Sequence, residues 1–162
     1  MNGFKEVMKK LQQQNIEVQL VEHEAAFTME DADRAIEGIP GVRTKTLFLM
    51  NKKKTRFYLL IMDEDKRLDM AAFKDLVDDR QLKMASEEML YEKLGLQPGG
   101  VSPFGLLNNK DGDVEVFVDQ DIAGEERMSF HPNTNEKTIF IKTVDLYSFL
   151  ENIGHPVKTV LL

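Results

Sequence analysis

VRTKTLFLM (residues 42–50) and RFYLLIM (residues 56–62), separated by the polar stretch NKKKT, are the part of the sequence that decides the fold. Two apolar runs of strand length around a short polar loop predict a β-hairpin. Successive side chains of a strand alternate between its two faces. Both sets are apolar here, so we expect the first strand to be buried on both sides: Leu47 and Leu49 on one face, Phe48 and Met50 on the other.

The rest of the chain adds short helices and strands to this hairpin. Apolar side chains at helical spacing predict helices over residues 4–14, 70–77, 86–94 and 143–150, and a further helix that begins at Thr28 and ends before Gly38. Alternating or continuous apolar runs predict strands over residues 16–20, 114–118 and 137–142, with a last short strand near residues 155–158. Hairpin spacing without regular βαβ alternation indicates a single α+β domain with a mixed or mainly antiparallel sheet.

Composition limits the possible functions. The 162 residues suffice for one domain with a sizeable core. The longest apolar runs are too short to cross a bilayer, the N-terminus does not resemble a signal peptide, and the chain has no cysteine, so we expect a cytoplasmic protein without thiol catalysis. The net charge is −7, and residues 61–130 hold 17 acidic but only 8 basic side chains. A nucleic-acid partner would therefore be held by few contacts.

The stretch GGVSPFG (residues 99–105) concentrates three glycines, a serine and a proline. Glycine permits positive φ, and Pro103 fixes its own φ and favours an extended Ser102. We expect a stiff loop without regular structure, whose exposed N–H groups suit a carboxylate, a phosphate or a developing oxyanion. A plain connecting loop is the alternative that the residues alone leave open.

Two further polar features are candidate binding sites. Lys45 lies where the leucine face of the first hairpin strand begins, so it is either an anion-binding residue or a lysine whose ammonium reaches solvent past its own methylenes. The segment FHPNTN (residues 130–135) follows a strand-like run, and His131 could donate, accept or titrate near neutrality. A turn in which Asn133 and Asn135 bond to their own backbone is the alternative. The three histidines fit no metal pattern, and we expect neither a metal nor a cofactor.

Four ordered motifs resemble one known family. TKTLFL (residues 44–49), RLDM (67–70), GGVSPFGLLN (99–108) and FHPNTN (130–135) are similar to motifs of the YbaK/ProX family of prolyl-tRNA-synthetase-associated editing domains. The histidine segment resembles the free-standing ProX type, which deacylates alanine mischarged on proline tRNA. The resemblance covers nearly the whole chain and implies a curved, barrel-like sheet flanked by helices, with the tRNA acceptor end and, as a possible partner, prolyl-tRNA synthetase.

The resemblance also implies roles for individual residues. Lys45 matches the family lysine expected to hold the phosphate or aminoacyl end of the tRNA terminus. The G-x-x-x-P loop is expected to supply N–H groups to the ester carbonyl, and His131 matches the ProX-type histidine, a binder of the 3′ end, a pocket wall or a base. The expected catalytic set is Lys45, Gly99, Gly100, Ser102 and Pro103. The expected substrate-binding set is Phe27, Thr28, Met29, Ala32, Leu47, Val101, Phe104, His131 and Asn133.

The implied reaction is hydrolysis of the ester between alanine and the terminal adenosine of proline tRNA. An aminoacyl ester is already activated, so water positioning and carbonyl polarisation suffice, and no strong nucleophile is evident in the sequence. Two alternatives stay open: deacylation of cysteine from the same tRNA, and a non-catalytic module that binds a tRNA or a synthetase.

Overall fold

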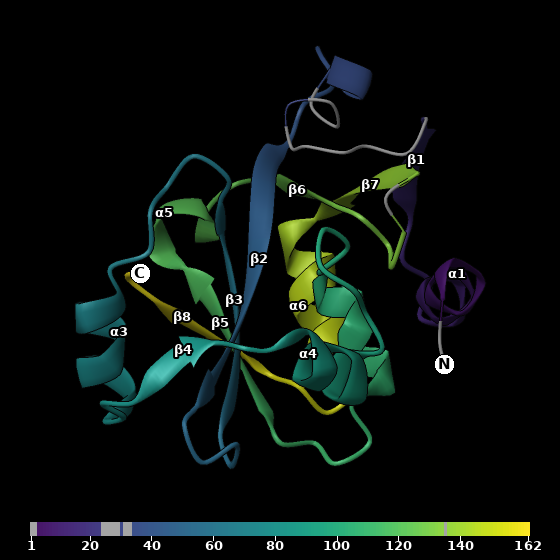
Figure 1. Cartoon of the computed structure of the whole chain (residues 1–162). Helices are drawn as coiled ribbons and strands as arrows, with labels where there is room; N and C mark the ends of the chain where they lie inside the picture. Colours follow the sequence, from purple (N-terminus) through teal and green to yellow (C-terminus); the bar gives the residue numbers. More distant parts are fainter. Residues whose placement is uncertain (1–2, 24–29, 31–33, 135) are drawn as a thin grey trace.

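A computed structural model describes residues 3–23, 30, 34–134 and 136–162. The hairpin expected from the sequence is the centre of the molecule (Figure 1). The elements are, in chain order, α1 (Phe4–Gln13), β1 (Val18–Glu22), β2 (Val42–Asn51), β3 (Phe57–Asp63), α3 (Met70–Val77), β4 (Leu82–Met84), α4 (Glu87–Leu94), the 3-10 helix η1 (Pro103–Asn108), β5 (Val114–Asp119), α5 (Gln120–Ala123), β6 (Arg127–Phe130), β7 (Lys137–Lys142), α6 (Thr143–Asn152) and β8 (Val157–Val160).

The strands form one mixed sheet in the order β1-β7-β6-β2-β3-β5-β8, with β4 paired to β2 beside this path. The pairs β1–β7, β6–β7, β2–β3 and β2–β4 are antiparallel, and β2–β6, β3–β5 and β5–β8 are parallel. The α+β class and the mixed sheet are therefore confirmed. The sheet does not close into a barrel, because β1 and β8 remain at its two ends.

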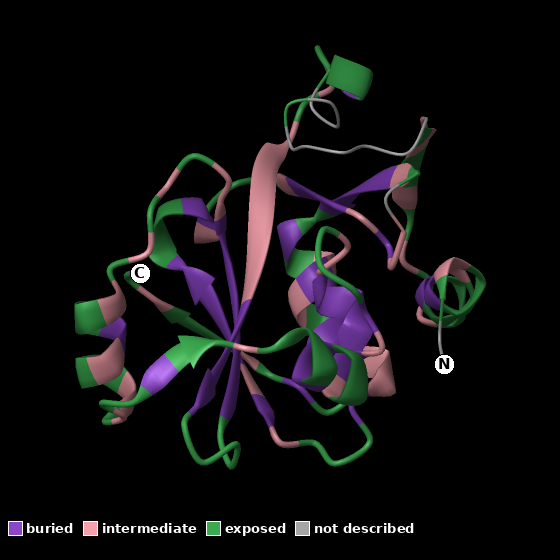
Figure 2. Ribbon diagram, in the orientation of Figure 1, coloured by how far each residue is buried: buried purple, intermediate pink, exposed green. Residues whose placement is uncertain are grey.

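The sheet separates two apolar clusters, as the two apolar faces of residues 42–50 predict. Phe48 and Met50 belong to the larger cluster, which also contains side chains of α1, α4, η1 and α6. Leu49 belongs to the smaller cluster, which contains Phe73 of α3. Every residue of β3 from Phe57 to Met62 is buried, and Figure 2 shows β3 and most of β5 in the colour of buried residues. This burial on both faces holds the hairpin in place.

Local signals placed most of the helix starts correctly. The side chains of Asp69 and Ser86 cap α3 and α4 by accepting hydrogen bonds from Ala72 N and Met89 N. The first residue of α6 is Thr143, whose hydroxyl instead donates to the carbonyl of Glu125 at 2.6 Å. Most of the helix expected from Thr28 lies outside the described residues. The short elements β4, α5 and η1 were not predicted.

Candidate functional site

The loop expected at residues 99–105 is only partly irregular. Gly99 has a φ of +86°, a conformation that favours glycine, and Gly100 N donates to the carbonyl of Gln97 at 3.1 Å. Ser102 is extended, with a φ of −148°, as expected before a proline. The expectation that the whole stretch lacks regular structure is wrong from Pro103 onward, because Pro103 begins η1 and the Ser102 hydroxyl caps this helix by accepting from Phe104 N.

Close packing anchors η1 in the larger apolar cluster. The Phe104 ring lies 5.9 Å from the Phe130 ring and 5.6 Å from the Phe149 ring, measured between centroids. A Cβ added to Gly105 would come within 2.6 Å of Leu96 Cδ1 and 3.1 Å of the Leu94 carbonyl oxygen. Glycine at this position therefore permits the close approach of η1 to the end of α4, which fixes the position of the preceding loop.

Two motifs that are far apart in the sequence meet at Ser102. Its hydroxyl donates to Asn133 Oδ1 at 2.9 Å, and the backbone N–H of Asn133 donates to the carbonyl of His131 at 2.8 Å. Asn133 itself has a φ of +60°, which is less costly for asparagine than for most residues. The glycine-proline loop and the His131 segment are thus joined by a side-chain hydrogen bond and by the contact between the Phe104 and Phe130 rings.

Backbone donors of the loop differ in their availability. The N–H of Gly100 is engaged in the turn with Gln97, so it is a poorer candidate for an oxyanion than the sequence suggested. Within the part of the chain that the structure describes, the N–H groups of Gly99 and Val101 have no acceptor. Gly99 is exposed and Val101 is half-buried. These two groups remain the better candidates for binding a carbonyl or phosphate oxygen.

Lys45 lies on β2 directly opposite Met62 of β3 and is partly exposed. Its ammonium makes no hydrogen bond or ion pair with any residue in the described ranges, the glycine-proline loop included. The first half of β2, up to Leu47, is only half-buried, and Figure 2 shows it in the intermediate colour. A lysine without a counter-ion at this position is compatible with binding an external anion.

Strand pairing places Lys45 on the same face of the sheet as the residues around His131. Phe140 of β7 pairs with Ser129 of β6, and Ser129 pairs with Arg43 of β2. Because paired residues share a face and positions two apart on a strand share a face, Lys45 and Thr138 lie on this side as well. The larger apolar cluster, which holds η1, lies on the other side. The loop before η1 is joined to the His131 segment by the Ser102–Asn133 hydrogen bond.

His131 is partly buried, and its Nδ1 lies 3.1 Å from the carbonyl oxygen of Lys137. Two residues that the sequence analysis did not select join it: the Thr138 hydroxyl lies 3.5 Å from the same nitrogen, and His23 Nε2 lies 2.9 Å from that hydroxyl. No local sequence signal could have selected them, because they are brought together by the pairing of β1 with β7, which juxtaposes residues more than a hundred positions apart. Of the five remaining candidate residues, the structure describes one. Leu47 packs against the smaller apolar cluster, while Phe27, Thr28, Met29 and Ala32 lie outside the described residues.

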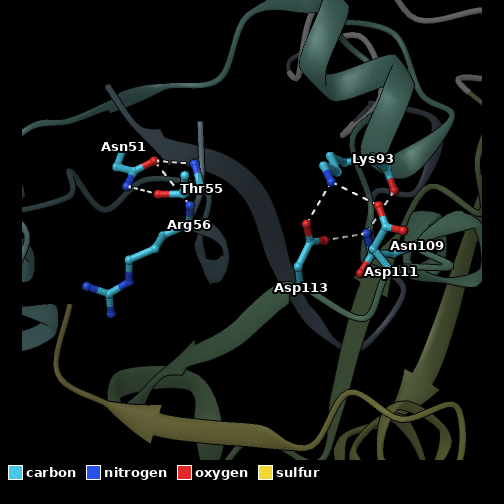
Figure 3. A network of polar contacts seen from close by, with 7 residues as sticks. All are labelled: Asn51, Thr55, Arg56, Lys93, Asn109, Asp111 and Asp113. Atoms are coloured by element: carbon cyan, nitrogen blue, oxygen red, sulfur yellow. Dashed lines mark hydrogen bonds and ion pairs between the residues drawn. The ribbon is translucent and has the colours of Figure 1, made fainter. Parts of the chain in front are cut away.

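A polar network holds the segment that follows η1 (Figure 3). Lys93 Nζ of α4 lies 2.6 Å from Asp113 Oδ2 and 3.1 Å from Asp111 Oδ2, and Asn109 Nδ2 donates to Asp113 Oδ1 at 3.0 Å. Burial alone would raise the pKa of Asp113, but the hydrogen bonds from Lys93 and Asn109 outweigh it and the pKa is lowered. The hydrogen bond to Asp113 is likewise the main reason why the pKa of Lys93 is raised. The network therefore ties α4 to the chain that links η1 with β5.

In the described ranges, no group of three or more His, Cys, Asp or Glu side chains could hold a metal ion. No helix in the same ranges is long and apolar enough to cross a membrane.

These observations define the class of the protein: an α+β domain with an open mixed sheet, in which a glycine-proline loop and a histidine segment are joined by a hydrogen bond and a ring contact. The model of the family described as "Aminoacyl-tRNA editing domain" matches residues 23–149. The chain therefore belongs to the aminoacyl-tRNA editing domain family.

Similar proteins agree with this assignment. The chain is 32% identical over its full length to the prolyl-tRNA editing protein ProX of Acetoanaerobium sticklandii, of which the alignment covers 99%. It is 33% identical over 153 residues to the prolyl-tRNA synthetase associated domain-containing protein 1 of Danio rerio, covering 93% of this chain and 83% of that protein. A crystal structure of a candidate trans-editing enzyme for prolyl tRNA synthetase superposes with a TM-score of 0.74 at 21% identity and covers 98% of this chain and 96% of that one, which shows the shared fold.

Proposed function

We propose that this protein hydrolyses the ester bond of mischarged proline tRNA, with alanine as the amino acid released. The observation that carries the proposal is the Ser102–Asn133 hydrogen bond, because it joins the glycine-proline loop to the histidine segment in one site. The family assignment and the full-length similarity to a prolyl-tRNA editing protein support the reaction class. The alanine preference rests on the resemblance of the His131 segment to the ProX type.

Hydrolysis of an aminoacyl ester needs polarisation of the carbonyl and positioning of water more than it needs a strong nucleophile. In the proposal, Lys45 holds the phosphate or aminoacyl end of the tRNA terminus, and the N–H groups of Gly99 and Val101 stabilise the oxyanion that forms when water attacks the ester carbonyl. A neighbouring ribose hydroxyl can assist that attack. His131 contacts the 3′ end or accepts a proton from the attacking group. Pro103 and Phe104 keep the loop rigid, and no cofactor takes part.

Editing is needed because a synthetase pocket shaped for proline cannot exclude alanine by binding alone. One or two missing methylenes are worth roughly 1–3 kcal/mol each, which is less discrimination than translation requires. A second pocket that admits alanine and excludes proline supplies the rest. Phe27, Thr28, Met29, Ala32 and Leu47 are proposed to line that pocket. Met29→Ala should then allow larger aminoacyl groups to be cleaved, and unchanged selectivity would count against this assignment.

Lys45→Ala tests the proposal against a non-catalytic binding module. We expect the variant to fold normally and to lose most of its deacylation of Ala-tRNA(Pro), measured in single turnover with enzyme in excess. Lys83→Ala is the matched control, because Lys83 is an exposed strand lysine on β4, which pairs with the other end of β2. A Lys45→Ala variant as active as Lys83→Ala would contradict the role of Lys45.

The same assay with Cys-tRNA(Pro) separates the nearest alternative. Cysteine and alanine differ by one sulfhydryl group, so a pocket that fits alanine tightly should disfavour cysteine. Faster release of cysteine than of alanine would replace the proposed substrate and leave the reaction class unchanged.

A further inference from the structure

Three side chains from different strands meet beside the proposed site. His23 follows β1, His131 follows β6 and Thr138 lies in β7. The two imidazole rings lie 6.3 Å apart between centroids in an edge-to-face arrangement, and the Thr138 hydroxyl is within 2.9 Å of His23 Nε2 and 3.5 Å of His131 Nδ1. Thr138 is only 1% exposed, so its hydroxyl has little access to water and depends on these partners.

The carbonyl oxygen beside the His131 ring determines which ring nitrogen carries the proton. A carbonyl oxygen can only accept, and the carbonyl of Lys137 is 3.1 Å from His131 Nδ1. The proton of the neutral ring therefore belongs on Nδ1, which makes Nε2 the nitrogen that can accept a further proton. The Thr138 hydroxyl oxygen is then a second acceptor beside this N–H group, and the same hydroxyl lies 2.9 Å from His23 Nε2, in a contact whose donor is set by the His23 tautomer.

We propose that Thr138 and His23 are positioning residues that hold the His131 ring in one orientation for the editing reaction. This inference rests on the proposed function, since it needs His131 in the site. Neither Thr138 nor His23 is assigned a contact with the substrate. They act through His131, whose backbone carbonyl accepts from Asn133 N and is linked through Asn133 to Ser102 of the glycine-proline loop.

A purely structural role for Thr138 would look different. Valine has nearly the same shape as threonine and at least as high a preference for strands, so a buried β-strand position needs no hydroxyl for packing. The partner of the hydroxyl is moreover a histidine that directly follows the neighbouring edge strand. The backbone N–H of this histidine donates to the carbonyl of Glu136, directly before β7, at 2.9 Å. The strand pairing thus survives loss of the hydroxyl, while the contacts that link the two rings through this hydroxyl are lost.

The kinetic test compares Thr138→Val with Thr138→Ser. We expect Thr138→Val to lower kcat for Ala-tRNA(Pro) by roughly tenfold to a hundredfold, the loss typical when the orienting partner of a metal-bound histidine is removed, with KM nearly unchanged. Thr138→Ser restores the hydroxyl and should recover most of kcat. Thr159→Val is the matched control, because Thr159 lies in β8 at the opposite end of the sheet and is exposed. A kcat of Thr138→Val equal to that of the Thr159→Val control would overturn the proposal.

A double-mutant cycle shows whether Thr138 acts through His131. In the His131→Ala background, Thr138→Val should have no further effect on kcat, because the group that it positions is already absent. Full additivity of the two losses would show an independent role and would refute the inference.

A spectroscopic readout keeps this inference separate from the proposed function. The 15N chemical shifts of the His131 ring should report a neutral tautomer protonated at Nδ1 in the unmodified protein, where the Lys137 carbonyl accepts that proton, and the Nδ1 resonance should shift in Thr138→Val because its contact with the hydroxyl is lost. This measurement needs no substrate. If the unmodified protein releases no alanine, the proposed function fails while the tautomer can still be read. A wild-type His131 protonated at Nε2, or ring resonances of His131 unaffected by Thr138→Val, would refute the positioning role.

Discussion

Replacing Lys93 by methionine should destabilise the half of the molecule that carries the glycine-proline loop. Lys93 is 12% exposed, its ammonium lies 4.8 Å from the centre of the Phe57 ring, and it pairs with Asp113, which is 31% exposed. Exposed ion pairs contribute about 0–1 kcal/mol, whereas breaking a fully buried pair costs about 3–5 kcal/mol. This pair lies between these limits, so we expect a loss of about 2 kcal/mol at pH 7. For a chain of this size the loss lowers Tm by about 4–8 °C.

The cost should depend on pH with a definite sign. The pKa of Asp113 is lowered in the folded state, so its stabilising contribution is present above its ordinary pKa and is lost as the pH falls through the folded value. The pKa of Lys93 is raised, so its contribution is present below its ordinary pKa and is lost only as the pH rises through the folded value. The cost of Lys93→Met should therefore be constant between about pH 5 and 9 and shrink below about pH 4.

Urea unfolding followed by circular dichroism measures this cost at pH 7 and at the lowest pH at which the protein still folds. Lys158→Met is the control: Lys158 and Glu115 are separated by 2.9 Å, but their side chains are 56% and 40% exposed, so the expected cost is about 0–1 kcal/mol. The reasoning fails if Lys93→Met costs no more than this control, or if its cost is the same in acid.

Two further predictions follow from packing and charge. Gly105→Ala should destabilise the protein by about 1–3 kcal/mol in the same unfolding assay, because the new methyl group would meet the Leu94 backbone at 3.1 Å. Gly124→Ala is the control and should be neutral, because no atom lies within 4 Å of the added Cβ. Equal effects of the two substitutions would contradict the packing argument. Binding of proline tRNA should weaken only modestly with salt. The net charge of −7 disfavours a large tRNA interface, so we expect contacts with about two or three phosphates at the acceptor end. A slope of log affinity against log salt typical of ten phosphates would contradict this.

The sequence predicted those parts of the fold that depend on local chemistry. The hairpin from β2 to β3 follows from uninterrupted apolar runs, and α3 and α4 follow from apolar side chains at helical spacing after Asp69 and Ser86, whose side chains satisfy helix N–H groups. The elements β4 and α5 were missed because, at three and four residues, they are too short to show a period. The 3-10 helix η1 was missed because a proline and a glycine hid the capping role of Ser102.

The site was predictable as separate motifs but not as an assembly. Residues 99–103 and His131 were chosen from their own chemistry, yet the hydrogen bond from Ser102 to Asn133 depends on tertiary packing. The role of Thr138 depends on the β1–β7 pairing that brings His23 to it, and no local pattern encodes that partner. The open sheet differs from the barrel-like form because strand number and residue pattern do not show whether the two end strands will pair with each other.

The most direct test of the account is the rate at which the purified protein releases amino acid from Ala-tRNA(Pro) and from Pro-tRNA(Pro) under single-turnover conditions. The account predicts rapid loss of alanine, with proline released no faster than from tRNA in buffer. Alanine that stays attached, or proline removed at the same rate as alanine, would contradict it.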